Sequence, residues 1–558
     1  MKRDTTKLTS KQFDVLIIGG GIYGVNAARD AALRGLSVAV IDKDDFGAAT
    51  SSNSLKIIHG GLRYLQHADF KRMRESITER KILMEIAPHL VHPLPCIMPT
   101  YGHALKSKEV MAVALFLNDL IGFDRNKLQD TQKHLPRGRV VSKKECLNII
   151  PGLSDENLTG GAIWYDCQVM NSERMLISVL HSAVENGAVA ANYMEMTDFI
   201  IRENQVTGIK ALDKISGESM TISAKLVMNN SGPWFNSVLR HLNGSVKKPD
   251  VQLSAAMNLV VRKKLFPEFA VGIWSKEEFK DADAIISKGS RLFFITPWKE
   301  YSLIGTTHVQ FQGEPDDFHI TEKDIEQFIA DVNAAYPMAN LNREDITFFY
   351  GGLLPADDID HATHNVKLLK SYKIIDHEVE SNLKGLLTVV GVKYTTARDV
   401  AEKTIDYVIK KLGVKDIPSA SSRTKVYGGD IDFFADYLNE EKSKATGNIS
   451  ENTIEHLVRN YGSEYRKILT YIDEKSELAK PVSKKSPVLQ AEVIHAVREE
   501  MACTLKDIVR VRTELGSAEY PGEAALRTCA GLAAKELNWD KQKIEDEIAA
   551  TKKVFITS

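Results

Sequence analysis

The amino-acid sequence predicts an α/β protein with an all-helical C-terminal part, and three observations support this prediction. Near the N-terminus, an apolar run at 14–18 precedes a glycine-rich turn, an alanine-rich helical pattern and a second apolar run at 37–41. Strand-like and helical stretches then alternate as far as about residue 410. Farther along, patterns of helical periodicity replace the strand signals, as at 450–461, 488–500 and 522–537.

The first β-turn-α-β unit carries a dinucleotide-binding pattern. Gly19, Gly21 and Gly24 have GxGxxG spacing, and Asp42 follows the second apolar run. In this motif the first glycine forms a tight turn, the second lets the backbone approach a pyrophosphate, and the third lets the helix pack on the strand. The N–H groups at the start of the helix bind the phosphates, and the acidic residue accepts hydrogen bonds from a ribose. The unit therefore predicts that the protein binds NAD or FAD.

Length, composition and charge narrow the class of protein. The chain has 558 residues, enough for roughly three or four units of ordinary domain size. Its 72 lysines and arginines nearly balance its 74 aspartates and glutamates, which gives a formal charge of −2. Because no charge excess attracts a polyanion, nucleic acid is not an expected partner. Hydrophobic residues at 43% and charged residues at 26% are close to the averages of soluble globular chains, so we expect an enzyme that acts on a small molecule.

Cysteine spacing and apolar runs indicate the compartment. The five cysteines form no CxxC pair, so neither a disulfide framework nor a metal site is expected. The N-terminal stretch is polar and basic and lacks the apolar core of a secretory signal, which favours a cytoplasmic protein. The longest apolar run, Val110–Phe123, contains Asn118 and Asp119 and is shorter than the ~20 residues of a membrane-spanning helix. It predicts a buried or amphipathic helix, with contact to a membrane surface as the alternative.

The residues after the second apolar run distinguish between the two cofactors. The segment ATSSNSLKIIHGGLRYLQ, at 49–66, resembles the signature of the aerobic, flavin-linked glycerol-3-phosphate dehydrogenases and oxidases. Further segments resemble motifs of this family in the family's order: WYDCQVMNSER at 164–174, KLVMNNSGPW at 225–234, RLFFITPWKEYSLIGTT at 291–307, VVGVKYTTAR at 389–398 and EVIHAVREEMACTLKDIVRVRTELG at 492–516. The resemblance covers nearly the whole chain and implies FAD as the cofactor.

The resemblance also implies a domain organisation. A glutathione-reductase-like FAD-binding domain of the Rossmann type is expected to be interleaved with an antiparallel-sheet substrate domain within residues 1–420. The substrate segments are expected at about 75–155 and 240–345, and an all-α C-terminal domain at 425–558. FAD is implied to stay bound, with the substrate lying against its isoalloxazine ring.

The family's cofactor contacts are implied at the positions of this chain that match the motifs. Gly19, Gly21, Gly24 and Asp42 would hold the ADP half; Thr50, Ser51, Ser52 and the backbone of Lys56, His59 and Gly60 would lie along the pyrophosphate and flavin; Met196, Ser231 and Gly232 would surround the adenosine; and Val392, Lys393, Tyr394 and Thr395 would face the pyrimidine edge of the flavin. The last segment would present a helix N-terminus, whose positive dipole end stabilises negative charge on a reduced flavin.

Oxidation of a secondary alcohol needs a hydride acceptor, a base near the hydroxyl and cations near any phosphate. The HGGLRY segment supplies His59 as a proton acceptor or flavin orienter, Arg63 as a clamp on an anion, and Tyr64 as a hydrogen-bond donor. Lys393 is a candidate to stabilise a developing alkoxide or to take the proton. Each of these residues has a structural interpretation too, and their shared place in two flavin-side motifs favours the catalytic one.

Three positions depart from the family pattern around the substrate phosphate. Leu354 stands where the family usually has an arginine, Lys370 lies where a second arginine is usual, and Asn258 aligns with a histidine. Because a bidentate arginine–phosphate contact contributes substantially to affinity, these changes put the substrate in question.

Three hypotheses follow. In the first, Arg63, Lys370 and Lys393 form an anion site, and the protein oxidises glycerol 3-phosphate or a similar polyol phosphate. In the second, Leu354 and Asn258 reshape the substrate site for a larger or less charged hydroxy compound, or for an amine. In the third, the protein binds FAD without turnover and serves as a partner protein.

The electron acceptor is expected to be a quinone or oxygen, and the sequence does not choose between them. Basic residues at the N-terminus, Lys2, Arg3, Lys7 and Lys11, leave a peripheral contact with the inner face of a membrane open, although a solvated tail is the simpler interpretation. A homodimer is a further alternative for the helical C-terminal domain. Its interleaved charges at 496–511 predict a solvated face.

Overall fold

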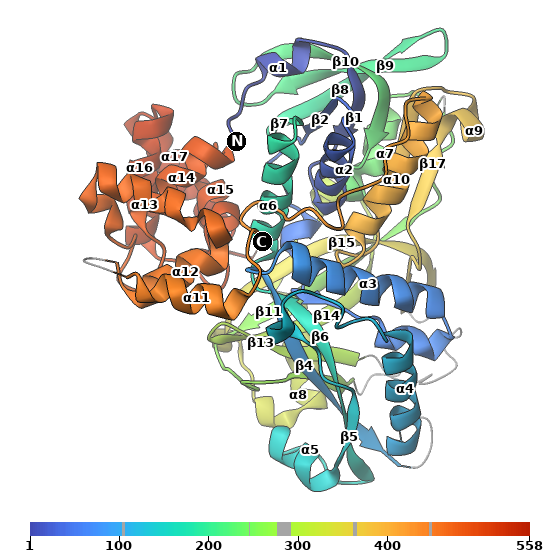
Figure 1. The fold of residues 1–558 in the computed structure, drawn as a ribbon, viewed down its shortest axis with the longest axis vertical. Helices are drawn as coiled ribbons and strands as arrows, with labels where there is room; N and C mark the ends of the chain where they lie inside the picture. The colour runs from blue at the N-terminus through green and yellow to red at the C-terminus, as the bar shows by residue number, and fades with distance from the viewer. Residues whose placement is uncertain (103–106, 245, 276–291, 361–364, 446–448, 558) are drawn as a thin grey trace.

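A computed structural model describes residues 1–558 apart from 103–106, 245, 276–291, 361–364, 446–448 and 558. Two β-sheets lie one above the other in the view of Figure 1, and a cluster of helices from the C-terminal part of the chain lies to their side. The N-terminus lies between the upper sheet and this cluster.

The first sheet has a parallel centre. Its strands, in spatial order, are β17 (Lys373–Asp376), β18 (Leu386–Val390), β10 (Ser219–Asn229), β1 (Phe13–Ile18), β2 (Val38–Ile41) and β7 (Val189–Ala191). All neighbouring pairs from β18 to β7 are parallel, and only β17 runs antiparallel to its neighbour. An antiparallel hairpin of β8 (Met194–Arg202) and β9 (Gln205–Asp213) continues from β10.

Strand β1 lies at the centre of this sheet and is buried on both faces. Because successive side chains point to opposite faces of a strand, Val15 and Ile17 pack with helices, whereas Leu16 and Ile18 pack with the β8–β9 hairpin. The helices are α2 (Ile22–Leu33), α6 (Ser172–Glu185) and α10 (Ala397–Leu412), and α2 packs against the other two. The predicted N-terminal β-α-β unit is therefore confirmed.

The second sheet is almost entirely antiparallel. Its strands, in spatial order, are β16 (Asn365–Leu368), β15 (Ile346–Asp360), β11 (Gln252–Val261), β14 (Tyr301–Phe311), β13 (Leu292–Trp298), β12 (Ala270–Trp274), β4 (Val91–Tyr101), β6 (Leu158–Val169) and β3 (Ile57–Ile58), with β5 (Arg139–Ser142) beside β6. The predicted substrate segments contain β4, β5 and β11–β14, whereas β6 and β15 lie outside them. The domain bounds themselves stay a prediction.

Helices from the middle of the chain surround the second sheet. They are α3 (Phe70–Ile86), α4 (Lys108–Ile121), α5 (Lys143–Ile149) and α8 (Glu322–Ala335). Helix α8 packs its apolar side, including Ile325 and Phe328, into the core of the sheet. Helix α4, which covers most of the longest apolar run, differs because only Leu115 among its residues is buried. It is therefore not a buried helix, and much of its apolar surface faces outward.

The C-terminal part is helical, as predicted. Its helices are α11 (Phe434–Ser443), α12 (Glu451–Tyr461), α13 (Arg466–Glu474), α14 (Gln490–Glu500), α15 (Leu505–Asp507), α16 (Glu523–Leu537) and α17 (Lys541–Lys553), and a π-helical turn, η10, spans Ile508–Arg512. The predicted helical stretches at 450–461, 488–500 and 522–537 match α12, α14 and α16. A parallel sheet, an antiparallel sheet and a helical part together confirm the predicted α/β fold class.

Buried ion pairs join the helical part to the first sheet. Arg512 donates through two guanidinium nitrogens to Asp45 at 2.6 and 2.7 Å, and both side chains are fully buried. Arg174 of α6 donates to both carboxylate oxygens of Glu500 at 2.8 and 2.6 Å. The prediction of a solvated face at 496–511 is therefore wrong. Its charges are satisfied by partners elsewhere in the chain, which one sequence does not reveal.

Substituting Glu500 by alanine should destabilise the protein strongly. The change leaves the Arg174 guanidinium buried without its partner, and breaking such a pair costs about 3–5 kcal/mol of the free energy of unfolding. Urea denaturation followed by circular dichroism measures the effect. Glu545→Ala, which removes an exposed partner of Arg527, is the control and should leave the midpoint unchanged. Equal midpoints for the two variants would contradict this account of the interface.

Candidate active site

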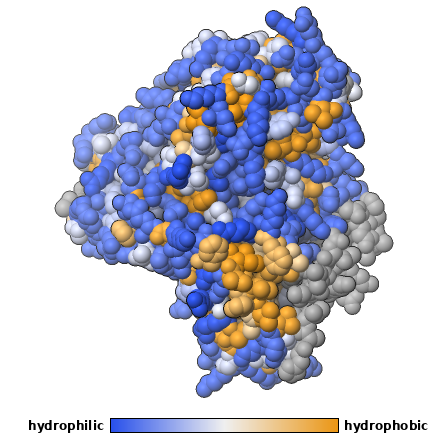
Figure 2. Space-filling model, turned by 45° about the vertical axis from the view of Figure 1, so that its right-hand side comes forward, coloured by the Kyte–Doolittle hydropathy of each residue, from blue (hydrophilic) through white to orange (hydrophobic). Residues whose placement is uncertain are grey.

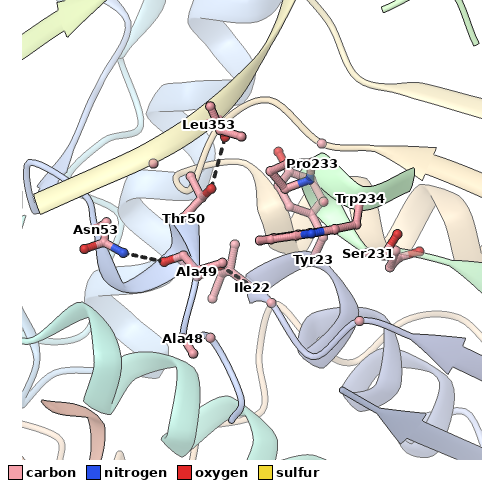
Figure 3. Close-up of a pocket in the computed structure, with 18 of the residues that line it drawn as sticks. Ile22, Tyr23, Ala48, Ala49, Thr50, Asn53, Ser231, Pro233, Trp234 and Leu353 are labelled. Carbon is pink, nitrogen blue, oxygen red and sulfur yellow. Dashed lines mark hydrogen bonds between the residues drawn. The ribbon is translucent and has the colours of Figure 1, made fainter. Parts of the chain in front are cut away.

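A cavity of about 610 Å³ lies between the two sheets. Its walls come from segments that are far apart in the chain: the glycine-rich turn, residues 42–55, residues 230–238 and residues 389–394. The second sheet contributes residues 352–355 and several side chains of β11 and β14. Figure 3 shows part of this wall, with Ile22 and Tyr23 near Pro233 and Trp234.

The glycine-rich turn has the close contacts that its motif requires. Gly19 has φ +107°, and a Cβ there would come within 2.4 Å of the Asn230 carbonyl oxygen. A Cβ on Gly24 would lie 1.9 Å from the Gly19 carbonyl oxygen, so a larger residue would separate α2 from β1. Helix α2 begins after Gly21 without a side-chain cap, and the Ser51 hydroxyl accepts a hydrogen bond from the Ile22 N–H at 2.9 Å. This N-terminus is suited to bind phosphate.

Asp42 lies directly after β2 and lines the cavity. Its carboxylate accepts hydrogen bonds from the N–H groups of Gly20, at 2.7 Å, and Asp44, at 3.0 Å. Burial raises the pKa of Asp42 to about 7, and the charges of Asp44 and Asp45 add to the effect while the two N–H groups oppose it. Each oxygen keeps acceptor capacity for a further hydrogen bond. The position matches its predicted role toward a ribose.

In the segment after residue 48, some side chains line the cavity and others have their partners in the protein interior. Thr50 lines the cavity, and its hydroxyl donates to the Leu353 carbonyl at 3.0 Å (Figure 3). The Ser52 hydroxyl instead donates to the Gly47 carbonyl, and the Lys56 ammonium group pairs with Glu173 at 2.8 Å in the interior. For Ser52 and Lys56, only the backbone is therefore left as a candidate for the cofactor contact.

The proposed adenosine end has both predicted and unpredicted residues. Met196, Ser231 and Gly232 line the cavity together with Trp234. The Trp234 indole donates to Asp316 at 2.9 Å, and the Lys43 ammonium group lies 4.4 Å from the centre of its ring. Trp234 stands in the SGPW segment, so the motif contained the signal for it, although no role was assigned.

A histidine and a buried aspartate meet beside the segment that follows β18. The ring of His59 is half exposed, and its Nδ1 lies 3.5 Å from an Asp166 carboxylate oxygen. Burial alone would raise the pKa of Asp166, but His59, the charge of Arg80 and the Gly60 N–H lower it to about 2. Asp166 is therefore ionised and able to orient the His59 ring. It belongs to the WYDCQ segment, whose aspartate received no role from the sequence alone.

Cations flank Tyr64. The ammonium group of Lys393 lies 4.1 Å from the centre of the Tyr64 ring, and the Arg72 guanidinium lies 5.0 Å from it. Arg72 also donates to the Lys370 carbonyl at 2.9 Å. The structure thus brings the predicted Lys393 to Tyr64, and it joins Tyr64 and the backbone of Lys370 through Arg72, which the sequence did not single out. The predicted clamp, Arg63, has a side chain outside the described part of the structure.

Asn258 lines the cavity on the side of the second sheet. Its amide oxygen accepts a hydrogen bond from the Thr306 hydroxyl at 2.7 Å, and its amide nitrogen donates to the Asn53 carbonyl at 3.3 Å. A Cβ on Gly305 would lie 1.9 Å from the same amide oxygen. The side chain of Asn258 therefore joins β11, β14 and the 50–55 segment, and Leu354 lines the same cavity.

A glycine-rich turn before an uncapped helix, a carboxylate directly after β2 and the pair of Tyr64 and Lys393 fit an FAD-dependent oxidoreductase. The family model "FAD dependent oxidoreductase" matches residues 14–390, and the model "C-terminal domain of alpha-glycerophosphate oxidase" matches residues 419–544. The chain belongs to the family of FAD-dependent glycerol-3-phosphate dehydrogenases and oxidases.

Relatives of known name support this assignment over nearly the full length. The chain is 32% identical to the glycerol-3-phosphate dehydrogenase of Synechocystis, covering 98% of this chain and 97% of the relative. It is 31% identical to the mitochondrial glycerol-3-phosphate dehydrogenase of Bos taurus, covering 98% and 74%. The crystal structure of the Bacillus halodurans glycerol-3-phosphate dehydrogenase with FAD aligns with a TM-score of 0.75 and 25% identity over 98% of this chain and 95% of that one.

FAD and the oxidoreductase class are thereby confirmed, and the cavity fits the cofactor. The turn at Gly19 and Gly24 has no room for side chains, α2 begins without a side-chain cap, and Asp42 follows β2 as the motif requires. The roles of the individual residues stay predictions. The structure places twelve of the predicted residues on the cavity wall: Gly19, Gly21, Asp42, Thr50, Ser51, Met196, Ser231, Gly232, Asn258, Val392, Lys393 and Tyr394.

The affinity for FAD should fall as the pH is lowered through about 7. Protonation of Asp42, whose pKa is about 7, removes acceptor capacity that the ribose hydroxyls need. Asp42→Asn should therefore weaken binding about tenfold at about pH 8 and abolish the pH dependence. Titration of the apo-protein with FAD, followed by flavin fluorescence, measures both effects. Asp198→Asn, a change at an exposed carboxylate of β8, is the control, and an unaltered pH dependence in Asp42→Asn would rule out this role.

Proposed function

We propose that the protein oxidises glycerol 3-phosphate to dihydroxyacetone phosphate and passes the electrons to a second acceptor through FAD. The observation that carries the proposal is the place of Lys393 on the cavity wall, with Tyr64 and Arg72 next to it and the His59 backbone bound to the nearby Thr395. Membership of the family and the names of the relatives support the same reaction.

The two ends of the substrate need different chemistry. When bound, FAD supplies N5 as the acceptor of the hydride that leaves C2 of glycerol 3-phosphate. His59 is the candidate to take the proton of the C2 hydroxyl, because Asp166 stabilises positive charge on its ring. The Lys393 ammonium group is the candidate to stabilise the negative charge that develops on the oxygen.

The substrate phosphate would lie near the remaining cations. Arg72 pairs with Asp69 at 2.5 Å, which leaves part of its guanidinium for other partners. Lys370 adjoins Arg72 through its backbone. Because Leu354 occupies the position at which the family usually has an arginine, we expect phosphate to contribute less to affinity than in such relatives. An anionic substrate is still favoured, since cations gather at this end.

Anaerobic mixing with saturating glycerol 3-phosphate should bleach the flavin absorption band. Lys393→Met should lower kcat/KM by about tenfold to hundredfold, because the developing negative charge loses its cation. Lys210→Met, at an exposed lysine of β9, is the control. A flavin that stays oxidised with glycerol 3-phosphate but is reduced by another hydroxy compound or an amine would replace this proposal by the second hypothesis, and no reduction by any of them would favour a non-catalytic protein.

We further propose that α4 docks on a membrane surface, where a quinone would accept the electrons. The side chains of Val113, Phe116, Leu120 and Phe123 are 60–72% exposed, and the lower part of the molecule carries a broad hydrophobic patch in Figure 2. None of the helices in the described residues has the length and apolarity needed to cross a bilayer. An apolar face of this kind is suited to lie in the interface instead.

Two features support lipid as the partner of this face. Arg74 and Lys127 lie over the Phe123 ring, at 5.2 and 5.8 Å; Arg74 is paired with Asp124, so Lys127 is the cation at this border that would attract anionic headgroups. The end of α4 is also close to the proposed active site. Ile121 packs against the cluster of Tyr64 and its neighbours, so the face and the substrate end adjoin the same short helix, η2 (Leu62–His67).

Replacing Phe116 and Leu120 together by serine should release the protein from membranes. In flotation with vesicles that contain phosphatidylglycerol, the wild-type protein should rise with the lipid and the double variant should stay at the bottom. Reduction of FAD by substrate should be unchanged, because neither residue lines the cavity. Val379→Ser, at an equally exposed apolar residue of α9 (His377–Ser381), is the control. Flotation of the double variant with the wild-type protein would exclude α4 as the membrane face.

A further inference from the structure

Tyr23 joins the glycine-rich turn to the flavin-side turn. It occupies the last variable position of the GxGxxG motif, in the first turn of α2. Its hydroxyl oxygen accepts hydrogen bonds from the N–H groups of Val392, at 2.9 Å, and Lys393, at 2.8 Å. The same hydroxyl donates to the Lys393 carbonyl at 2.7 Å. A single side chain thus holds both backbone polar groups of Lys393 and the N–H of the residue before it.

These hydrogen bonds engage both the donor hydrogen and the acceptor oxygen of the phenolic hydroxyl, and the Thr396 side chain also bonds to it. Burial raises the pKa of Tyr23 above its ordinary value, so the hydroxyl keeps its proton and its donor role. The N–H groups of Val392 and Lys393 are therefore committed within the protein. Of the four residues that the resemblance implies at the pyrimidine edge, Tyr394 and Thr395 remain as candidates to donate backbone hydrogen bonds there.

The ring of Tyr23 also shapes this turn. A Cβ on Gly391 would lie 2.3 Å from a ring carbon of Tyr23, closer than carbon atoms approach without displacement. The ring therefore packs directly against the backbone between β18 and α10. Tyrosine at 23 and glycine at 391 form a matched pair, in which the absent side chain of one makes room for the ring of the other.

The turn that Tyr23 holds carries the catalytic candidates. The side chain of Lys393 extends to the face of the Tyr64 ring. The Thr395 hydroxyl accepts a hydrogen bond from the backbone N–H of His59 at 3.3 Å. A shift of this turn would move Lys393 and change the support of His59 together. On the other side, Tyr23 belongs to the helix whose N-terminus is suited to bind the pyrophosphate.

We propose that Tyr23 is a positioning residue that links the pyrophosphate end of the FAD site to the reacting end. Its hydroxyl fixes the backbone at Lys393, and this sets the place of the ammonium group and of the N–H groups that follow it. The part that concerns Lys393 rests on the proposed function. The part that concerns the flavin environment does not need the substrate.

The test compares Tyr23→Phe with the wild-type holoenzyme. Phenylalanine keeps the packing on Gly391 and removes only the hydrogen bonds of the hydroxyl. The rate of flavin reduction by glycerol 3-phosphate should fall about tenfold to hundredfold, since misplacing a reacting group by about 1 Å can slow a reaction about hundredfold. The midpoint potential of FAD, measured by dye equilibration without substrate, should become more negative, because the donors at the pyrimidine edge are less well placed to stabilise negative charge.

Tyr336→Phe is the matched control. Its hydroxyl donates to the Pro151 carbonyl at 2.6 Å, away from the cavity, so it reports the loss of a tyrosine hydroxyl without a change in the site. Gly391→Ala is the second variant, and it should shift the potential in the same direction by displacing the Tyr23 ring. Wild-type potentials in both Tyr23→Phe and Gly391→Ala would overturn the inference. If instead the wild-type flavin is not reduced by glycerol 3-phosphate while Tyr23→Phe alters the potential, the proposed substrate fails and the positioning role stands.

Discussion

The close contact between backbones at the glycine-rich turn is the constraint on which the rest of the site depends. The backbone at Gly24 lies so close to the Gly19 carbonyl, and that at Gly19 so close to the Asn230 backbone, that neither position has room for a Cβ. Helix α2, β1 and the end of β10 therefore meet here without intervening side chains. Only this approach brings the start of α2 beside the ends of three parallel strands. The cavity, the carboxylate after β2 and the turn after β18 all take their places from it.

The candidate site is assembled from residues that are distant in sequence. His59 and Tyr64 come from one motif, Lys393 from another, and Asp166 and Tyr23 bind them through side chains to which their motifs gave no role. The motifs predicted several of the segments that line the cavity, because glycine-rich turns and hydroxyl-rich stretches can be recognised in the sequence. They did not predict which side chains hold the others in place, because such contacts depend on how separate segments pack.

The partners of charged side chains also depend on how separate segments pack. The formal charge of −2 describes the whole chain, but it does not tell which charged side chains are buried in pairs. Glu500 was expected on a solvated face and is buried in a pair with Arg174, and the nearby Arg512 is buried in a pair with Asp45; both pairs join the helical part to the first sheet. The reverse holds for α4, where apolar residues that suggested a core helix face outward.

The sequence by itself determined the class of fold and a dinucleotide-binding unit, because these depend on local patterns of glycine, strand and helix, and its resemblance to a known family implied FAD and the flavin-side motifs. Tertiary structure decided which predicted residues face the cavity. Ser52 and Lys56 stand inside a motif yet direct their side chains elsewhere, while Arg72 stands outside the motifs and lies beside Tyr64. The physical reason is that a motif records the path of the backbone, whereas the direction and partners of each side chain are set by the segments that pack against it.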